Sequence, residues 1–306
     1  MTGSVLLIYN PNSGYFIENS VENIEPFFTE LVQQSAASIQ LSFLPLTALK
    51  TVNLVKHLKR LAVDQVWVAG GDGTVISIAG QLEGEQIPLG ILPLGTMNLL
   101  ARDAGMSLEL TEAAEQLVNA RPVLIDMAFM NDKPYLCLSN IGMSTRLTAL
   151  REALRQHRAW SRWPLMCFYL LRFVVKFPAM EVELVQDGRC HRLKTRSISI
   201  SNNRLSDSGG LIPRRNQLNC GVLGVYAVRD RSLWTLPRMV LRLFSRDWFG
   251  DKDLLSFEAT QVAIRFKKYR KVVSVMCDGE LSQEAPPLEY RIRPQSVMLL
   301  CPGEQK

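Results

Sequence analysis

The sequence predicts two domains: a doubly wound α/β domain over residues 1–122 and an antiparallel, β-sandwich-like domain over residues 123–306. Two observations support this fold class. Before residue 122, apolar strands alternate with helical segments, which is the pattern of βαβ units. After it, short strands follow one another with turn signals such as QDG and CDG, which is typical of a sandwich or barrel. The chain has 306 residues, 47% of them hydrophobic, so it is long and apolar enough to bury both cores.

In the first domain, strands separated by helices favour a parallel sheet that is covered on both faces. Ser20 is a candidate N-cap of the first long helix, and Pro26 inside that helix conflicts with the assignment. The expected strands are 4–10, 39–46, 63–70 and 87–95, and the expected helices are 20–35, 51–62, 75–82, 98–105 and 110–120.

In the second domain, the spacing of strands and turns predicts a mostly antiparallel sheet. We expect its last strand to return to the first domain. The expected strands lie within 123–143, 181–203, 221–230, 255–266, 271–280 and 288–302.

Cysteine usage and charge limit the class of protein. The six cysteines contain no C-x-x-C pair, which argues against a zinc site, and the start of the chain lacks a basic region before its short apolar run. We therefore expect reduced thiols in the cytoplasm. The net charge is +6, but residues 145–250 hold 19 Lys/Arg against 7 Asp/Glu, giving +12 there and −6 elsewhere. This basic region implies an anionic partner: nucleic acid, a phosphorylated ligand or a membrane surface.

Three turn-and-glycine sequences follow predicted strands of the first domain: NPNSG (10–14), GGDGT (70–74) and PLGTMN (93–98). Parallel strands point their carboxyl ends the same way, so these loops can converge on one crevice and offer backbone N–H groups to phosphate. The alternative is that they are only tight turns and helix caps. Neither the P-loop pattern nor the G-x-G-x-x-G pattern is present.

Five segments resemble, in order and spacing, the diacylglycerol kinase and sphingosine kinase superfamily, which shares GGDGT with NAD kinases. They are NPNSG, VAGGDGT, GILPLGTMNLLARDAG, IDMAF and CDGE. The resemblance implies an NAD-kinase-like α/β domain that binds ATP and a C-terminal domain that supplies the lipid side. It also implies transfer of phosphate from ATP to a lipid hydroxyl with Mg²⁺. The late acidic motif favours the lipid-kinase branch over the NAD kinases.

The resemblance also assigns roles by position. Asp72 is the acid of the phosphate loop, Glu280 is the second acid, and Thr47 falls where the family often has a nucleotide-contacting threonine. The remaining nucleotide contacts would come from the three loops: Asn10, Ser13, Gly14, Gly70, Gly71, Gly73, Thr74, Gly95, Thr96 and Asn98.

A carboxylate at Asp72 needs a reason, because it repels phosphate. A metal ion that bridges phosphate oxygens reverses the local electrostatics, so Asp72 is expected to bind Mg²⁺, to act as the base for the lipid hydroxyl, or to do both. Glu280 would orient substrate or metal. The alternatives are structural: Asp72 as a loop-stabilising turn residue, and Asp278-Gly279 as a hairpin turn.

The chain departs from the family at several positions. Tyr15 and Phe16 stand where a basic residue is usual, Asn98-Leu99 replaces an acidic stretch, and Ile76-Ser77 replaces Asn-Glu. Ser144 stands in place of an aspartate. The segment 219–223, which begins Asn219-Cys220, replaces an acidic metal-binding motif, so that metal site is expected to be lost.

Residues 146–177 combine arginines at helical spacing with Trp160, Trp163 and the apolar run LMCFYLL. The run is too short and too charged to span a bilayer, and the composition is typical of an interfacial helix on anionic lipid. Residues 237–249 repeat the theme. The alternative is an amphipathic helix packed on the sandwich. Nucleic-acid binding is not expected, because no known binding module is present.

These observations predict an ATP- and Mg²⁺-dependent kinase of a diacylglycerol-like lipid that works in the cytoplasm, peripherally at the inner face of the membrane. Two alternatives stay open: a catalytically weak nucleotide- and lipid-binding protein, and a kinase of a non-lipid acceptor. The acceptor lipid and the oligomeric state stay open as well.

Overall fold

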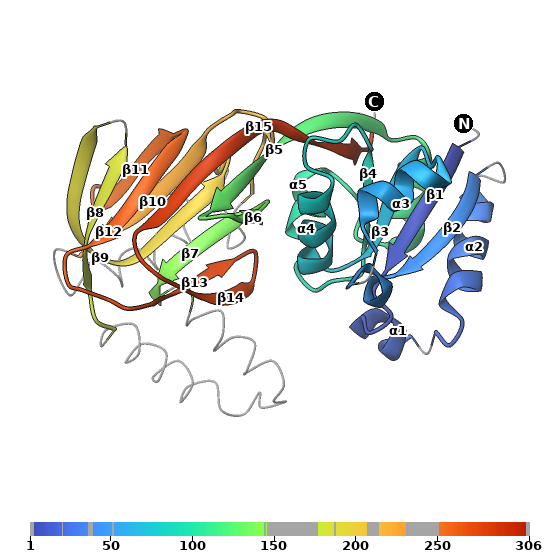
Figure 1. Ribbon diagram of the computed structural model, residues 1–306, viewed down its shortest axis with the longest axis horizontal. Coiled ribbons are helices and arrows are strands. Elements are labelled where there is room, and N and C mark those ends of the chain that lie inside the picture. The colour runs from blue at the N-terminus through green and yellow to red at the C-terminus, as the bar shows by residue number, and fades with distance from the viewer. Residues whose placement is uncertain are drawn as a thin grey trace. The chain divides into compact units, whose positions relative to one another are not determined.

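The contacts of the computed structural model divide the chain into two compact units (Figure 1). The first comprises Met1–Met127, Gln217–Asn219 and Arg293–Lys306, and the second comprises Ala128–Asn216 and Cys220–Ile292. The predicted fold class is confirmed, since the first unit is α/β and the second is built from strands in the part that is described. The structure describes residues 3–19, 21–35, 39–50, 52–143, 145, 177–186, 188–206, 214–230 and 251–303.

The first unit contains a parallel sheet with strand order β4-β3-β1-β2. Its strands are β1 (Gly3–Tyr9), β2 (Ile39–Pro45), β3 (Gln65–Gly70) and β4 (Leu89–Pro93). The central strands β1 and β3 are almost wholly buried, which explains why they are near-continuous apolar runs. The carboxyl ends of β1, β3 and β4 therefore lie side by side.

Helices connect and cover these strands: α2 and α6 pack on each other, α2 on β2, α6 on β4, and α4 on β3. The helical elements are α1 (Gly14–Glu18), α2 (Ile24–Ser35), η1 (Leu46–Lys50), α3 (Leu54–Leu61), α4 (Asp72–Gln81), α5 (Leu99–Asp103) and α6 (Leu110–Val118). No helix in the described part of the chain is long and apolar enough to cross a membrane.

Helix α2 begins at Ile24, so the predicted start at residue 20 is wrong. Pro26 lies in the first turn, where its missing N–H has no partner to lose, and this removes the conflict that the longer helix created. The Phe27 N–H donates to the Asn23 carbonyl at 3.1 Å and closes that turn. Ser20, the predicted cap, lies outside the described residues.

Aromatic rings join α1 to α2. Phe16 and Phe28 are buried and meet edge to face, with ring centroids 6.0 Å apart. Tyr15 packs against both Phe16 and Phe27, with centroids 5.9 and 6.5 Å away. The aromatic pair at positions 15 and 16, which departs from the family pattern, thus contributes to the core of the first unit.

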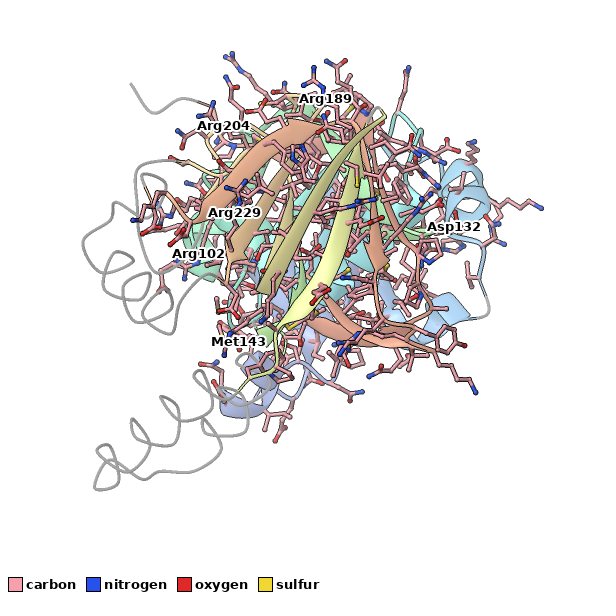
Figure 2. The ribbon with its side chains drawn as sticks, turned by 90° about the vertical axis from the view of Figure 1, so that its left-hand side faces the viewer. Arg102, Asp132, Met143, Arg189, Arg204 and Arg229 are labelled. Carbon is pink, nitrogen blue, oxygen red and sulfur yellow. The ribbon has the colours of Figure 1, made fainter. Side chains whose placement is uncertain are left out.

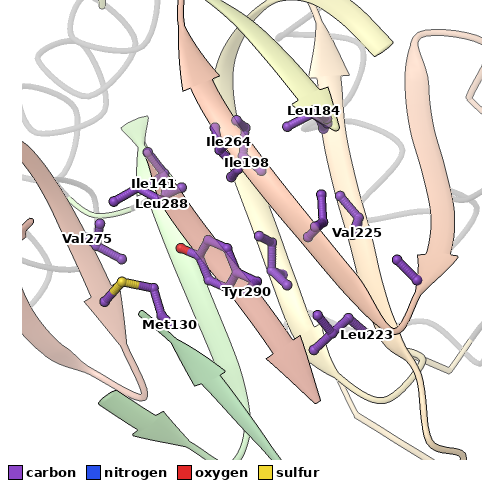
Figure 3. Close-up of a cluster of buried hydrophobic side chains, with 14 of the residues drawn as sticks. Met130, Ile141, Leu184, Ile198, Leu223, Val225, Ile264, Val275, Leu288 and Tyr290 are labelled. Atoms are coloured by element: carbon purple, nitrogen blue, oxygen red, sulfur yellow. The ribbon is translucent and has the colours of Figure 1, made fainter. Parts of the chain in front are cut away.

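The second unit is organised around the long strand β9 (Arg189–Asn202), which pairs antiparallel with β8, β7 and β10. The apolar side chains of this unit form the buried cluster in Figure 3, in which Ile198 and Ile264 lie next to each other. The other strands are β6 (Lys133–Tyr135), β7 (Leu138–Gly142), β8 (Met180–Gln186), β10 (Leu223–Arg229), β11 (Leu254–Ala259), β12 (Gln261–Phe266), β13 (Val273–Cys277), β14 (Glu280–Glu284) and β15 (Leu288–Cys301). Strand β5 (Arg121–Met130) belongs to the first unit up to Met127 and ends in the second. Strand β15 begins in the second unit, and its last residues, from Arg293, belong to the first, where Leu299 pairs with Leu89 of β4.

Asp278 ties the β13–β14 hairpin to the segment between β6 and β7. Its buried carboxylate accepts the N–H groups of Leu136 (2.6 Å to Oδ2), Cys137 (2.9 Å to Oδ1) and Leu138 (2.6 Å to Oδ1). Burial raises the pKa of this carboxyl from 3.8 to about 6, against the opposing effect of those N–H donors and of Arg215. One side chain therefore fixes backbone segments about 140 positions apart in the sequence.

Replacing Asp278 with Asn should destabilise the protein by about 1–3 kcal/mol at neutral pH. The amide group has one acceptor oxygen where the carboxylate has two, so at least one of the three buried N–H groups would lose its acceptor. The folded-state pKa lies above the unfolded one, so the contribution of this group to stability is largest below pH about 4 and is lost as pH rises through about 6. The wild-type advantage over Asp278→Asn should therefore grow, by up to roughly 2–3 kcal/mol, between pH 7 and pH 4. Urea unfolding of both proteins across this range checks it, and a gap that narrows with acidification would contradict it.

Candidate active site

The three glycine loops follow adjacent parallel strands. Residues 10–14 follow β1, 70–74 follow β3 and 93–98 follow β4, and these three strands lie side by side in Figure 1. Direct hydrogen bonds also join the strand ends: the Asn10 N–H donates to the Ala69 carbonyl at 3.2 Å, and the Leu94 N–H donates to the Gly70 carbonyl at 3.1 Å. The three sequences thus form one surface at a single edge of the sheet.

Glycine is required where the second and third loops meet. A Cβ atom on Gly95 would lie 2.6 Å from the Gly71 Cα and 2.7 Å from the Asn98 Oδ1. A Cβ on Gly70 would lie 2.8 Å from the Thr74 Cβ. All three distances are shorter than side chains tolerate, so a larger residue at position 95 would push the two loops apart and one at position 70 would displace Thr74.

Asn98 holds the third loop in shape through its side chain. Its Oδ1 accepts the Gly95 N–H at 2.9 Å, and its Nδ2 donates to the Gly95 carbonyl at 2.8 Å. Asn98 is buried and has a left-handed backbone (φ 47°), which asparagine tolerates better than most residues. In this structure its amide group faces the loop, and its predicted contact with nucleotide stays a prediction.

Ser13 attaches the first loop to the third. Its buried hydroxyl donates to the Leu94 carbonyl at 3.2 Å. Within the first loop, the Asn12 N–H donates to the Asn10 Oδ1 at 3.1 Å, which forms an Asx turn. The alternative that this sequence forms a turn is thus confirmed for the first loop, and its predicted contacts with nucleotide stay a prediction.

Asp72 lies at the junction of the second and third loops. It is the first residue of α4, and its Oδ1 accepts the Leu99 N–H at 2.8 Å, where α5 begins. Burial raises the pKa of Asp72 above its ordinary value, and the backbone N–H donors of residues 98–100 oppose that rise. A partly desolvated carboxylate close to two helix N-termini is stabilised in its charged form yet remains a stronger base than an exposed one.

Several of the predicted contact residues border open space. Thr47, in η1 after β2, and Thr96, in the third loop, are exposed. A Cβ added to Gly14 would meet no atom within 4 Å. Local packing therefore does not require glycine at position 14, in contrast to position 95.

Glu280 belongs to the second unit, whereas Asp72 belongs to the first. Asp278 and Gly279 form the two-residue turn between β13 and β14, with φ values of 48° and 92°, as the structural alternative proposed. Glu280 follows that turn and pairs with Cys277 in the β13–β14 ladder, but it is exposed and its carboxylate has no hydrogen bond or ion pair with any residue the structure describes. Its carboxylate is thus not committed to the fold.

Two buried acids were not proposed as functional from the sequence, although both lie in the quoted motifs. Asp126 of IDMAF is fully buried, and its Oδ1 accepts the Gln295 N–H at 2.8 Å within the first unit. Asp278 of CDGE anchors the hairpin that carries Glu280. An acid inside an apolar strand run was the signal for Asp126, since such residues are rarely buried without a partner.

The residues fit a magnesium ion that arrives with a nucleotide. Among the described residues, no three His, Cys, Asp or Glu side chains gather into a metal-binding group. Mg²⁺ keeps several waters and is commonly held by one or two carboxylates together with substrate phosphates. Asp72 is placed to be the protein ligand in such an arrangement. In segment 219–223, the N–H of Cys220 donates to the Asn203 Oδ1 at 2.8 Å.

Two family models match the chain. Residues 4–130 match the diacylglycerol kinase catalytic domain, and residues 140–301 match the YegS C-terminal NAD kinase beta sandwich-like domain. Together they include all three glycine loops and the CDGE turn.

Similar proteins and solved structures agree with these two family models. A protein of Yersinia enterocolitica described as "Probable lipid kinase YegS-like" is 38% identical over 99 residues, which cover 31% of this chain and 33% of that protein. One of Klebsiella pneumoniae with the same description is 37% identical over 100 residues, so the chain matches about a third of the length of these curated relatives. A crystal structure titled "putative diacylglycerol kinase", from Bacillus anthracis, is 21% identical, has a TM-score of 0.71 and covers 98% of this chain and 97% of its own, which supports the fold.

Two glycine substitutions should separate packing from ligand space. Gly95→Ala should lower the free energy of unfolding by about 1–3 kcal/mol, because its Cβ collides with the Gly71 backbone. Gly14→Ala should leave stability unchanged or raise it by roughly 0.5–1 kcal/mol, since the site is open and lies in a helix. If a nucleotide occupies that space, the added methyl group should still weaken ATP binding.

Urea unfolding and titration with a fluorescent ATP analogue measure the two effects. ATP affinity that is unchanged in Gly14→Ala would place the nucleotide away from residues 10–14, and a fully stable Gly95→Ala would contradict the packing of the loops.

Proposed function

Because this chain belongs to the diacylglycerol kinase and sphingosine kinase superfamily, we propose that it transfers the γ-phosphoryl group of ATP to a hydroxyl of a diacylglycerol-like lipid. One observation carries the proposal: the partly buried carboxylate of Asp72 lies where the glycine loops after β3 and β4 meet. An acid and backbone donors together suit a reaction that combines phosphate, a cation and a hydroxyl proton.

The donor side is formed by the three loops. Their backbone N–H groups and the exposed hydroxyl groups of Thr47 and Thr96 supply hydrogen-bond donors for phosphate and ribose oxygens. The close contact of Gly71 with Gly95 sets the spacing between the second and third loops. A rigid arrangement of this kind positions a phosphoryl group without rearrangement during the reaction.

Asp72 would act on the acceptor. The lipid hydroxyl oxygen attacks the γ-phosphorus, and the bond from that phosphorus to the β–γ bridging oxygen breaks, so that ADP leaves. The hydroxyl proton passes to the Asp72 carboxylate, whose raised pKa makes it a better proton acceptor than an exposed aspartate. When bound, Mg²⁺ would neutralise charge on the phosphate oxygens. Glu280, whose carboxylate no described residue engages, would orient the acceptor.

The acceptor side includes the membrane. We propose that the protein meets the bilayer from the cytoplasm and that residues 146–177 contribute to this contact. Apart from Phe177, these residues lie outside the described part, as do residues 237–249 and Ser144.

A second candidate function is a nucleotide- and lipid-binding protein with little catalysis. The observation in its favour is that Asn98-Leu99 occupies the place of an acidic stretch, and the Asn98 amide group is engaged with Gly95. The same assays distinguish the two, because binding without transfer would favour this candidate.

Substitutions at Asp72 should separate its charge from its contact with α5. Asp72→Asn retains an oxygen that can accept the Leu99 N–H, so it should fold with a melting temperature near that of the wild type. It should still lose at least about 100-fold in the rate of lipid phosphorylation, because it cannot take a proton. Asp72→Ala should lose activity and also about 1–2 kcal/mol of stability. Labelled ATP with Mg²⁺ and a lipid extract reports activity, and full activity in Asp72→Asn would sink the proposed base.

Glu280→Gln should reduce the rate of lipid phosphorylation while changing stability by less than about 0.5 kcal/mol, because the side chain is exposed and without a described partner. A matched control is Glu289→Gln, another exposed acid on a strand of the second unit. Equal activity of wild type and Glu280→Gln would remove Glu280 from the mechanism and leave the role of Asp72 standing.

A further inference from the structure

The turn between β12 and β13 is the most basic short stretch that the structure describes. Residues 265–272 read RFKKYRKV, with five Lys or Arg residues and no acid. Every residue of this stretch except Phe266 is exposed. We name it the basic turn.

Most of this charge is not neutralised. Lys267 pairs with Glu181, with 2.9 Å between Nζ and Oε2, and the Arg270 guanidinium lies 5.6 Å from the centroid of the Phe266 ring. Lys268 and Lys271 have no ion-pair partner among the described residues. Like charges this close repel one another, so the fold gains nothing from gathering them.

Exposed apolar groups stand among these cations. Tyr269 is 91% exposed and Val272 is 51% exposed. Tyr side chains are amphipathic and favour the boundary between water and lipid head groups, and cations beside them favour an anionic surface. The combination is the one that an interfacial anchor uses.

The place of the basic turn in the sheet supports the same reading. Phe266 pairs with Val182, and the Lys267 N–H donates to the Glu181 carbonyl, so the turn lies at the end of the sheet where β8 begins. Figure 2 shows Met143, just after β7, and Arg189, at the start of β9, at opposite ends of these strands. Strand β8 begins at the Met143 end, because Met180 pairs with Thr195 while Gln186 pairs with Arg189. Gly142, at the end of β7, and Met180, at the start of β8, therefore both lie at the end of the sheet that carries the basic turn.

A cavity of about 390 Å³ adjoins the turn and is also basic. Lys194, Lys268 and Arg270 line it, and none of them has an ion pair in the described residues. Arg196 in the same cavity is compensated, since its Nε lies 3.2 Å from the Asp230 Oδ1. Glu181 also lines the cavity and attracts Lys194 and Lys268. The lining therefore holds four cations against two acids, Glu181 and Asp230, and this excess of positive charge suits a phosphate group.

We propose that the basic turn is a docking surface for an anionic phospholipid bilayer, with Tyr269 at the head-group level and a lipid phosphate in the adjoining cavity. This surface is separate from the glycine loops, and the proposal does not depend on phosphoryl transfer. It commits to a bilayer because the exposed Tyr269 and Val272 need an apolar phase, which a free phosphate does not supply.

The test is flotation of the full chain with vesicles of phosphatidylcholine, alone or with about one third phosphatidylglycerol. Wild type should float with the anionic vesicles and not with the neutral ones. Lys268→Glu/Lys271→Glu should weaken binding by roughly 30-fold or more, and Tyr269→Ser by a smaller factor at constant charge. The matched control is Lys56→Glu/Arg189→Glu, which makes the same change in charge at exposed cations that are not part of the turn and should bind within about threefold of wild type.

Each other outcome would overturn the proposal. Wild type that does not float, a basic-turn variant that floats like wild type, or a control that is as weak as that variant would each do so. Release by millimolar glycerol phosphate would show a site for a free anion, and tighter, turn-dependent binding of single-stranded RNA would show a nucleic-acid surface. Circular dichroism melting confirms that every variant is folded.

Discussion

The close approach of two glycine backbones at the carboxyl ends of β3 and β4 is the constraint on which the candidate site depends. Gly71 and Gly95 can meet only because neither has a Cβ atom. Their contact brings the start of α4 to the start of α5, so that one carboxylate, that of Asp72, reaches the Leu99 N–H. The first loop joins them through the Ser13 hydroxyl. A larger residue at position 71 or 95 would therefore move the Leu99 N–H away from the Asp72 carboxylate.

The position of Asp72 explains why an acid can occupy a loop that is expected to bind an anion. Its charge is held by backbone N–H groups rather than by a cationic side chain, and burial acts against that charge. The N–H groups favour the charged form of this carboxylate, and burial makes it accept a proton from a neighbouring hydroxyl more readily than an exposed carboxylate would. The structural alternative and the catalytic prediction for this residue are thus compatible, because a single oxygen serves the contact with α5.

The sequence predicted the elements well and the tertiary hydrogen bonds poorly. Strand ends and loop positions follow from apolar runs and glycine turns, which are local signals. The double contact of Asn98 with Gly95 and the cap that Asp278 places on residues 136–138 depend on where distant backbone groups lie. The start of α2 was also predicted wrongly. Pro26 conflicts with a helix that begins at residue 20, but it is compatible with one in which it occupies the first turn. Pattern reasoning therefore found the motifs, but it did not find which of their side chains the fold itself uses.

The departures from the family pattern change where the charge in the site comes from. Positions 15 and 16 hold aromatic rings that pack α1 on α2, and position 98 holds an amide group that shapes a loop. At these positions, uncharged side chains thus stabilise the packing of the helices and the shape of the third loop. The described loops then present mainly backbone N–H groups and one carboxylate, so the electrostatics of the site depend on the backbone path and hence on the glycines. A site with few charged side chains depends more strongly on the exact positions of its loop backbones, so it tolerates less movement of these three loops.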